Sequence, residues 1–214
     1  MLRDDSVCQP AGRRCAAPGV APLPCARVGI TPVTSLPTLR YQPFYCEENI
    51  FYLCQDPRFA ARSPEALFVS GTSGECVMWR QKQAGRPGAA MSWDYHVILL
   101  VQDPWEIWDF DTSLGFPVPA AEYLRWSFRP DVELPAEVAP YFRIVEAKEL
   151  VATFASDRSH MRKRGGEFQK APPPWPTIGA EGVASNLRRF IAMEDRIAGE
   201  VVSLATLLAR VTPS

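Results

Sequence analysis

His96 is one of only two histidines in the chain, and it lies in a pattern that suits acid–base chemistry. From Trp93 to Val101 the sequence is aromatic and β-branched and then solidly apolar, which predicts a β-strand. Because side chains alternate between the faces of a strand, Asp94 shares the face of His96. Imidazole is the side chain whose ordinary pKa suits a base at neutral pH. The alternative is a buried structural histidine, so the surrounding residues have to decide between the two.

Two carboxylates follow this strand at a spacing that suits an imidazole partner. Asp103-Pro104 predicts a tight turn, and Glu106–Asp111 predicts an antiparallel strand that returns beside His96. A turn centred on that dipeptide pairs His96 with Asp111 and places Asp109 diagonally on the same face. Turn geometry alone favours Asp111 as the partner of the imidazole, whereas a bulge would favour Asp109. Strand-end aspartates that face water are the structural alternative.

Cys46 is the candidate nucleophile because it begins a predicted helix. Apolar residues recur at helical spacing from Cys46 to Cys54, and Glu47 and Glu48 occupy the first turn, where carboxylates complement the helix dipole. The positive end of a helix lowers the pKa of a thiol and stabilises the thiolate. The alternative is a small buried apolar residue, which is our interpretation of Cys54 and Cys76.

A Cys, then a His, then an Asp is the order found in papain-like and transglutaminase-like thiol enzymes. In such a site the imidazole takes the thiol proton, and the carboxylate fixes its tautomer. The helix N-terminus supplies a backbone N–H for an oxyanion. We therefore expect an α/β (α+β) fold of this kind, in which helices flank an antiparallel sheet. Other expected strands are Ala66–Ser70 with its hairpin partner Cys76–Gln81, and Phe142–Glu146; other expected helices are Ala120–Trp126, Leu187–Met193 and Glu200–Val211.

Composition limits the other classes of function. The chain has 214 residues and a formal net charge of -1, which argues against a protein that binds nucleic acid or anionic membranes. We find no apolar run near the roughly 20 residues of a membrane-spanning helix and no secretory signal. The six cysteines include no Cys-x-x-Cys pair, so we expect no structural zinc site. Without a secretory signal we expect reduced thiols in a cytoplasmic protein. We also expect no catalytic metal and no cofactor.

The distribution of proline indicates how the chain divides into an extension and a domain. Residues 1–40 are rich in Pro, Ala and Arg and have little periodicity, so we interpret them as a flexible extension. Residues 41–214 are then a single catalytic domain. Ala171–Pro176 contains four prolines, and we interpret it as a wall packed on this domain rather than as a ligand for a partner protein. His160 lies in a polar loop and is expected to be structural or to line the site.

Five sequence motifs together indicate the function more specifically than the single residues do. They are Tyr-Cys-Glu-Glu-Asn-Ile at 45–50, Trp-Asp-Tyr-His-Val at 93–97, Asp-Phe-Asp-Thr at 109–112, Phe-Ala-Ser-Asp-Arg-Ser-His-Met at 154–161 and Pro-Pro-Pro-Trp-Pro at 172–176. Together they resemble the protein N-terminal glutamine amidohydrolase family, which is known by its Trp-Asp-Tyr-His-Val string. The resemblance runs from about Tyr41 to the C-terminus.

The resemblance implies a monomeric thiol hydrolase that converts an N-terminal glutamine of a protein or peptide to glutamate and releases ammonia. In the family this reaction is a step of the N-degron pathway. The resemblance also implies a cytoplasmic, or additionally nuclear, location. Carried over by motif, the nucleophile is Cys46, the base is His96 and the orienting acid is Asp109. The resemblance thus replaces the preference of the turn geometry for Asp111.

An enzyme restricted to chain termini has to recognise the free α-ammonium group, and a carboxylate near the thiol is the simplest means. Asp94 is our first candidate, followed by Glu47 and Glu48. Tyr45 and Trp93 flank the nucleophile and base motifs and are expected to contact the substrate. Two alternatives remain open, namely a papain- or transglutaminase-like protease or acyltransferase with the same triad, and a non-catalytic module that binds N-termini.

Overall fold

The sheet that carries His96 has six antiparallel strands in the order β6-β5-β4-β1-β7-β8. We analysed a computed structural model that describes residues 38–179 and 182–212. The strands are β1 (Glu65–Ser70), β4 (His96–Val101), β5 (Glu106–Trp108), β6 (Val118–Pro119), β7 (Tyr141–Glu146) and β8 (Glu200–Ser203). Every residue of β1 and β4 is buried, which is why these two strands have almost uninterrupted apolar sequences.

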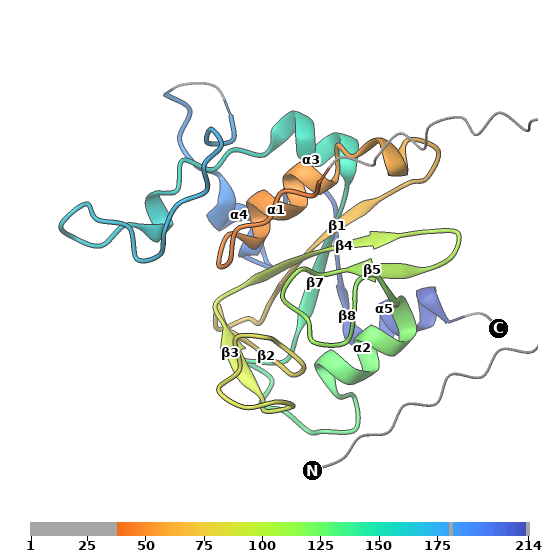
Figure 1. Ribbon diagram of the computed structural model, residues 1–214. Coiled ribbons are helices and arrows are strands. Elements are labelled where there is room, and N and C mark those ends of the chain that lie inside the picture. Colours follow the sequence, from red (N-terminus) through yellow and green to blue (C-terminus); the bar gives the residue numbers. More distant parts are fainter. Residues whose placement is uncertain (1–37, 180–181, 213–214) are drawn as a thin grey trace, which may run out of the picture. The chain divides into compact units, whose positions relative to one another are not determined.

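Helices cover both faces of this sheet (Figure 1). One face packs against α1 (Cys46–Leu53), α3 (Ala147–Thr153) and α4 (Leu187–Ile191), and the other against α2 (Ala120–Phe128) and α5 (Leu204–Val211). Short 3-10 turns occupy Pro57–Phe59 and Ser159–Met161. The expected mixed fold, with helices flanking an antiparallel sheet, is confirmed. The expected extension 1–40 lies outside the described residues apart from its last three positions.

The helix that begins with Cys46 packs directly on the strand that begins with His96. In the core on that face, Ile50 and Leu53 of α1 meet Val97 and Leu99 of β4. Both elements are apolar toward each other because α1 follows the helical repeat and β4 alternates its side chains. The fold therefore brings the first residue of a helix close to the first residue of a strand.

The strand predicted from Trp93 to Val101 is in fact two strands. β3 (Met91–Trp93) pairs with β2 (Cys76–Met78) in a separate two-stranded sheet, and the chain crosses into the main sheet at Asp94 and Tyr95. The prediction that residues 76–81 pair with β1 is wrong. Both edges of β1 are already occupied, by β4 and by β7, so β2 has to find another partner.

The hairpin after β4 has the register that its turn predicts. Leu99 pairs with Trp108 and Val101 with Glu106, as expected for a turn centred on Asp103-Pro104. However, β5 ends at Trp108 rather than at the expected Asp111. The two aspartates therefore lie on a segment that has left the sheet, and strand pairing does not fix their positions.

The helix predicted from Glu200 to Val211 is a strand followed by a helix. Val201 and Val202 pair with β7, since β-branched residues favour strands. The side chain of Ser203 then caps α5 by accepting a hydrogen bond from Thr206 N–H. The sequence analysis also missed α3. In the described residues no helix is both long enough and apolar enough to cross a membrane.

Candidate active site

A cavity of about 190 Å³ lies where the start of α1 meets the start of β4. Cys46 and His96 both line it, although each is almost fully buried. Trp93, Asp94, Asp111 and His160 are also part of its wall. The cavity thus brings together a thiol, two imidazoles and two carboxylates from four separate segments of the chain.

His96 is held by Asp109 through a hydrogen bond of 2.9 Å between Nε2 and Oδ1. The same carboxylate oxygen accepts the Asp111 N–H at 2.9 Å. Because a carboxylate only accepts, Nε2 carries the proton and Nδ1 presents its lone pair. Nδ1 is buried and has no hydrogen-bond partner. The imidazole is therefore oriented on one side and left with an unused basic nitrogen on the other.

Asp109 is fixed in turn by two residues that the sequence analysis missed as site residues. Its Oδ2 accepts from Tyr123 OH at 2.8 Å and from Gln81 Nε2 at 3.4 Å. Burial alone would raise the pKa of Asp109, but His96, the Asp111 N–H and Tyr123 lower it below its usual value. Tyr123 lies on the buried face of α2, and its place in an amphipathic helix was the one sequence signal that could have drawn attention to it.

Asp109 in turn determines the direction of the pKa shift of His96. Burial lowers the pKa of the imidazole, but the Asp109 carboxylate outweighs this effect and the net result is a raised pKa. The Trp93 ring stacks on the imidazole, with centroids 5.3 Å apart and planes inclined by 17°. Trp93 therefore covers one face of His96 and limits the contact of the ring with water.

Cys46 differs from the sequence expectation in its charge state. It is the first residue of α1, as predicted, but burial and the carboxylates of Glu47 and Asp111 raise the pKa of its thiol well above the usual value. The helix-terminus effect is modest and is outweighed by the loss of hydration. The raised pKa favours the neutral thiol, so a thiolate at this position would need a proton acceptor nearby.

Comparison with known proteins assigns the chain to a family. A family model described as N-terminal glutamine amidase matches residues 41–211. The protein N-terminal glutamine amidohydrolase of Homo sapiens is 35% identical over 179 residues, which cover 79% of this chain and 86% of that protein. The Arabidopsis thaliana protein of the same name is 34% identical over 166 residues, which cover 72% of this chain and 75% of that protein. The chain belongs to the N-terminal glutamine amidase family.

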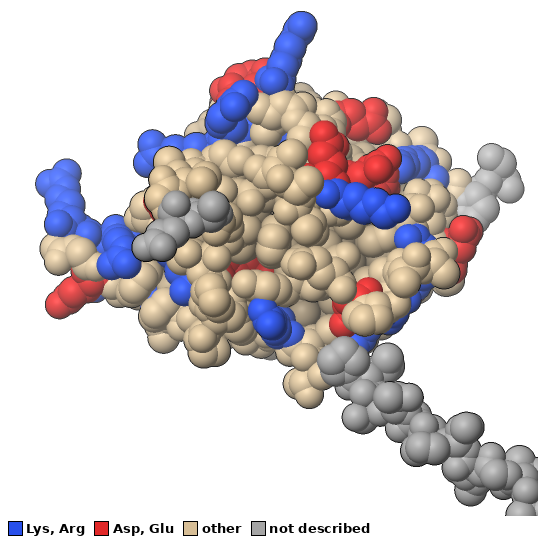
Figure 2. All heavy atoms as spheres, turned by 90° about the horizontal axis from the view of Figure 1, so that it is seen from above, with Lys and Arg blue, Asp and Glu red and all other residues tan. Residues whose placement is uncertain are grey.

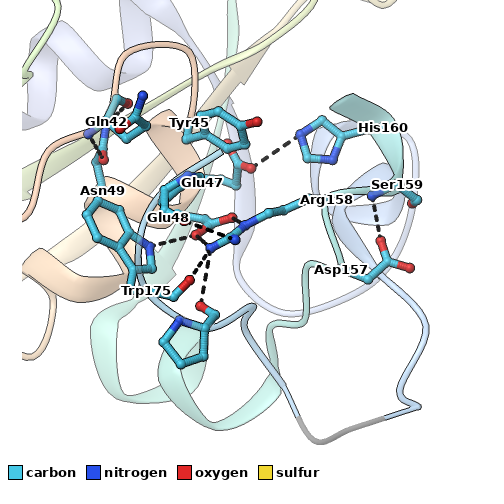
Figure 3. Close-up of polar contacts among 12 residues, drawn as sticks. Gln42, Tyr45, Glu47, Glu48, Asn49, Asp157, Arg158, Ser159, His160 and Trp175 are labelled. Carbon is cyan, nitrogen blue, oxygen red and sulfur yellow. Dashed lines mark hydrogen bonds and ion pairs between the residues drawn. The ribbon is translucent and has the colours of Figure 1, made fainter. Parts of the chain in front are cut away.

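In this member of the N-terminal glutamine amidase family, the glutamate two positions after Cys46 is a structural anchor. Glu48 accepts from Arg158 Nε at 2.6 Å, from Arg158 Nη2 at 2.8 Å and from Trp175 Nε1 at 2.7 Å (Figure 3). Arg158 also donates to the main-chain oxygens of Pro173 and Trp175. The proline-rich segment is thereby fastened to α1. Glu48 does not line the cavity, and its oxygens are already used, so we do not retain it as a ligand for the substrate amine.

Loss of this buried anchor should weaken the fold. Glu48→Gln would leave the Arg158 guanidinium in a site where Glu48 is fully buried and Arg158 nearly so, without a matching charge. Breaking a buried pair from one side costs about 3–5 kcal/mol of unfolding free energy. The measurement is denaturant unfolding of both proteins. Asp131→Asn is the matched control, because its ion pair with Arg129 lies in water and its loss should leave the unfolding midpoint nearly unchanged.

The remaining predicted substrate contacts divide into two groups. Asp94 is exposed and lines the cavity, and its Oδ1 accepts from Tyr95 N–H at 3.1 Å. Trp93 also lines the cavity, as described above. By contrast, Tyr45 is fully buried beside the cavity and donates to the Lys170 carbonyl at 3.1 Å. Glu47 is fully buried behind Cys46 and contacts His160, which does line the cavity.

Three groups in the site have ligand atoms close enough to suggest a metal site. Atoms of His96, Asp109 and Asp111 lie within 4.8 Å of one another. However, Asp109 already accepts from four donors, and Asp111 accepts from Tyr41 OH at 2.8 Å. A metal ion would have to displace the Asp109 bond that orients His96. The donor set thus fits a hydrogen-bonded His–Asp pair better than a metal centre.

Chelation should therefore leave the activity unchanged. We expect the same rate of ammonia release from a glutamine-initiated peptide before and after dialysis against EDTA, because the oxygens of Asp109 are already occupied by hydrogen bonds. The assay is repeated after addition of Zn²⁺. A loss of activity on dialysis that Zn²⁺ restores would contradict the prediction.

Proposed function

We propose that this protein hydrolyses the side-chain amide of an N-terminal glutamine, giving an N-terminal glutamate and ammonia. Membership of the N-terminal glutamine amidase family supports this reaction. The observation that carries the mechanism is the oriented imidazole, with Nε2 bound to Asp109 and Nδ1 unpartnered in a site that also contains Cys46. We further propose that the helix-start cysteine and the strand histidine define a papain- or transglutaminase-like architecture.

The first half-reaction transfers the acyl group to sulfur. His96 Nδ1 takes the thiol proton as Cys46 Sγ attacks the side-chain carbonyl carbon, and the Asp109 carboxylate stabilises the imidazolium that forms. The tetrahedral intermediate then collapses, and the imidazolium returns the proton to the departing nitrogen. Ammonia leaves, and the glutamyl side chain remains as a thioester on Cys46. The resting neutral thiol is consistent with proton transfer at the moment of attack.

The second half-reaction is hydrolysis of this thioester. His96 Nδ1 removes a proton from water, and the hydroxide attacks the thioester carbonyl. Collapse expels the Cys46 thiolate, which recovers its proton from the imidazolium. The product carries the γ-carboxylate of glutamate, and the enzyme returns to its resting state without a cofactor taking part.

The size and charge of the cavity favour a terminal residue over a mid-chain segment. Its volume of about 190 Å³ is below the range of about 300–1,000 Å³ that drug-sized ligands occupy, so it suits one amino-acid side chain. Asp94 is an exposed carboxylate in its wall, and we propose that it pairs with the α-ammonium group of the substrate. A chain terminus is then recognised by its charge and the glutamine by the reach of its carboxamide to Cys46.

Acetylation of the substrate should remove most of the activity. We expect a Gln-initiated peptide with a free amine to release ammonia at least about tenfold faster than its N-acetyl form, because a hydrogen bond to a charged group is worth about 1.5–3 kcal/mol. Pyroglutamyl peptides should be inert because they lack both the ammonium and a free carboxamide. Asp94→Asn should reduce kcat/KM for the free-amine peptide more than for the acetylated one. Ammonia release is the measurement throughout.

Peptides with an internal glutamine test the main alternative. A protease or acyltransferase with the same triad would accept mid-chain residues, whereas the proposed enzyme should not release ammonia from them. Equal turnover of free and acetylated peptides would show that no amine recognition exists, and the protease or acyltransferase function would then be preferred.

A further inference from the structure

A second polar cluster lies directly behind the nucleophile and has no part in the mechanism above. Glu47 is fully buried, and its carboxylate points toward His160 from the neighbouring 3-10 turn (Figure 3). The two are joined at 3.3 Å between Oε1 and Nε2. Tyr95 completes the cluster, with its hydroxyl 3.0 Å from Glu47 Oε2 and 3.2 Å from His160 Nε2.

The hydrogen positions in this cluster follow from the donor inventory. Tyr95 has one O–H, which it donates to the Glu47 carboxylate, so its oxygen can only accept from His160. His160 Nε2 therefore carries a proton, which it directs to Tyr95. Glu47 Oε1 is buried and has no hydrogen bond of its own. His160 Nε2 lies 3.3 Å from this oxygen, so His160 is the group placed to compensate the buried carboxylate, while its own Nδ1 is buried without a partner.

The charge of Glu47 matters because the carboxylate touches the nucleophile. Cys46 Sγ lies 3.9 Å from Glu47 Oε2. A negative carboxylate at this distance in a buried site opposes formation of the thiolate, and burial leaves few waters to screen it. The mechanism nevertheless needs that thiolate, or a thiol close to it, during each attack. A compensating positive charge on the far side of Glu47 would remove this conflict.

We propose that His160 is a positioning residue, and that its ring, held against Glu47, offsets the effect of this carboxylate on Cys46. His160 thereby acts on the nucleophile through Glu47 without touching the reacting atoms. Arg158, which precedes the same 3-10 turn, is bound to Glu48, so it does not substitute. The inference rests on the proposed role of Cys46 as the nucleophile.

Several other ionisable groups face the thiol and have to be held constant in a test. They are Asp94, Tyr95 and His96 from the β3–β4 segment and Asp111 from the segment after β5. His160 itself is 18% exposed and also lines the cavity. Thiol reactivity in the absence of substrate isolates the contribution of Glu47 and His160, because it requires neither binding nor turnover.

The test is a double-mutant cycle read by alkylation. Wild type, His160→Gln, Glu47→Gln and the double mutant are treated with iodoacetamide, a neutral reagent, across a series of pH values. The rate is measured on the Cys46 peptide by mass spectrometry. Cys54 and Cys76 are internal references, since burial raises the pKa of each thiol to about 12.

We expect His160→Gln to slow alkylation of Cys46 at neutral pH by about tenfold, which corresponds to one unit of thiol pKa. Its pH–rate profile should move to higher pH by the same amount. Glu47→Gln should be at least as reactive as wild type. The double mutant should return to the wild-type rate or exceed it, because the charge that needed cancelling is gone. Losses that add up in the double mutant would overturn the proposal and indicate a structural role, as would an unchanged rate in His160→Gln.

Lys170→Gln is the matched control for loss of a positive charge. Lys170 also lines the cavity, but its ammonium lies 4.2 Å above the Phe44 ring and not against Glu47. It is exposed, so we expect alkylation of Cys46 to change by less than about twofold. An effect as large as that of His160→Gln would mean that any nearby cation suffices, which contradicts the specific role of His160.

Ammonia release from a Gln-initiated peptide separates this inference from the proposed function. Turnover by the wild type together with an unshifted alkylation profile in His160→Gln refutes the role of His160 alone. A shifted profile without turnover of any glutamine peptide refutes the proposed function and leaves the coupling of His160 to the thiol intact.

Discussion

Replacement of Cys46 by alanine should reduce ammonia release from a Gln-initiated peptide by at least about ten-thousand-fold, as expected when a catalytic unit loses its nucleophile. The imidazole and the Asp109 carboxylate remain in place, but neither can form the thioester. The fold should persist, because Cys46 is the first residue of α1 and alanine deletes only the sulfur atom. The rate is measured on purified protein whose thermal unfolding matches that of the wild type.

Cys54→Ala is the matched control for this substitution. Cys54 ends the same helix, is partly buried and lies outside the cavity, so its loss should leave turnover near the wild-type value. Cys46→Ser should be as inactive as Cys46→Ala, because a hydroxyl is a much weaker nucleophile toward an amide in this site. Substantial turnover by Cys46→Ala would rule out the thiol mechanism.

The sequence predicted the parts of the site that depend on local periodicity. The helix beginning at Cys46 and the hairpin register around Asp103-Pro104 are both local, and both are present. Which of Asp109 and Asp111 contacts His96 depends on the path of the chain beyond the strand, and local periodicity does not predict that path. The register is as the turn predicts, yet the chain leaves the sheet after Trp108 and turns Asp109 toward His96. Counting the strand register from the turn could not predict that bend, whereas the motif resemblance indicated Asp109.

Long-range contacts account for what the sequence could not supply. In the sequence Glu48 and Glu47 are equivalent first-turn carboxylates, but the partner of Glu48, Arg158, is 110 positions away. The helix terminus predicts a lowered thiol pKa for Cys46, whereas burial, the adjacent Glu47 and the distant Asp111 raise it. Burial and the approach of distant charges are properties of the tertiary structure, and no short pattern encodes them.

Replacement of His96 should be as damaging as replacement of Cys46, since nucleophile and base act as a unit. Asp109→Asn should reduce kcat by about ten-thousand-fold, although the two side chains have nearly the same shape. An asparagine amide can donate to His96 Nε2, and Nδ1 would then carry the proton and be unable to accept one from Cys46. The Asp109 carboxylate also raises the pKa of His96, so the acid limb of any residual pH–rate profile should move to lower pH. Steady-state ammonia release gives both quantities.

Asp111→Asn provides the comparison that identifies the orienting acid. Asp111 lines the cavity and accepts from Tyr41, but it reaches Asp109 through its main-chain N–H, which the substitution preserves. We therefore expect a change of about tenfold or less, because the substitution removes a charge that raises the pKa of both Cys46 and His96 but leaves the bond between Asp109 and His96 in place. Thermal unfolding of all three variants shows whether a loss reflects chemistry or folding. A larger effect at Asp111 than at Asp109 would mean that the imidazole changes partner in the working enzyme, and that the strand register rather than the observed hydrogen bond identifies the catalytic carboxylate.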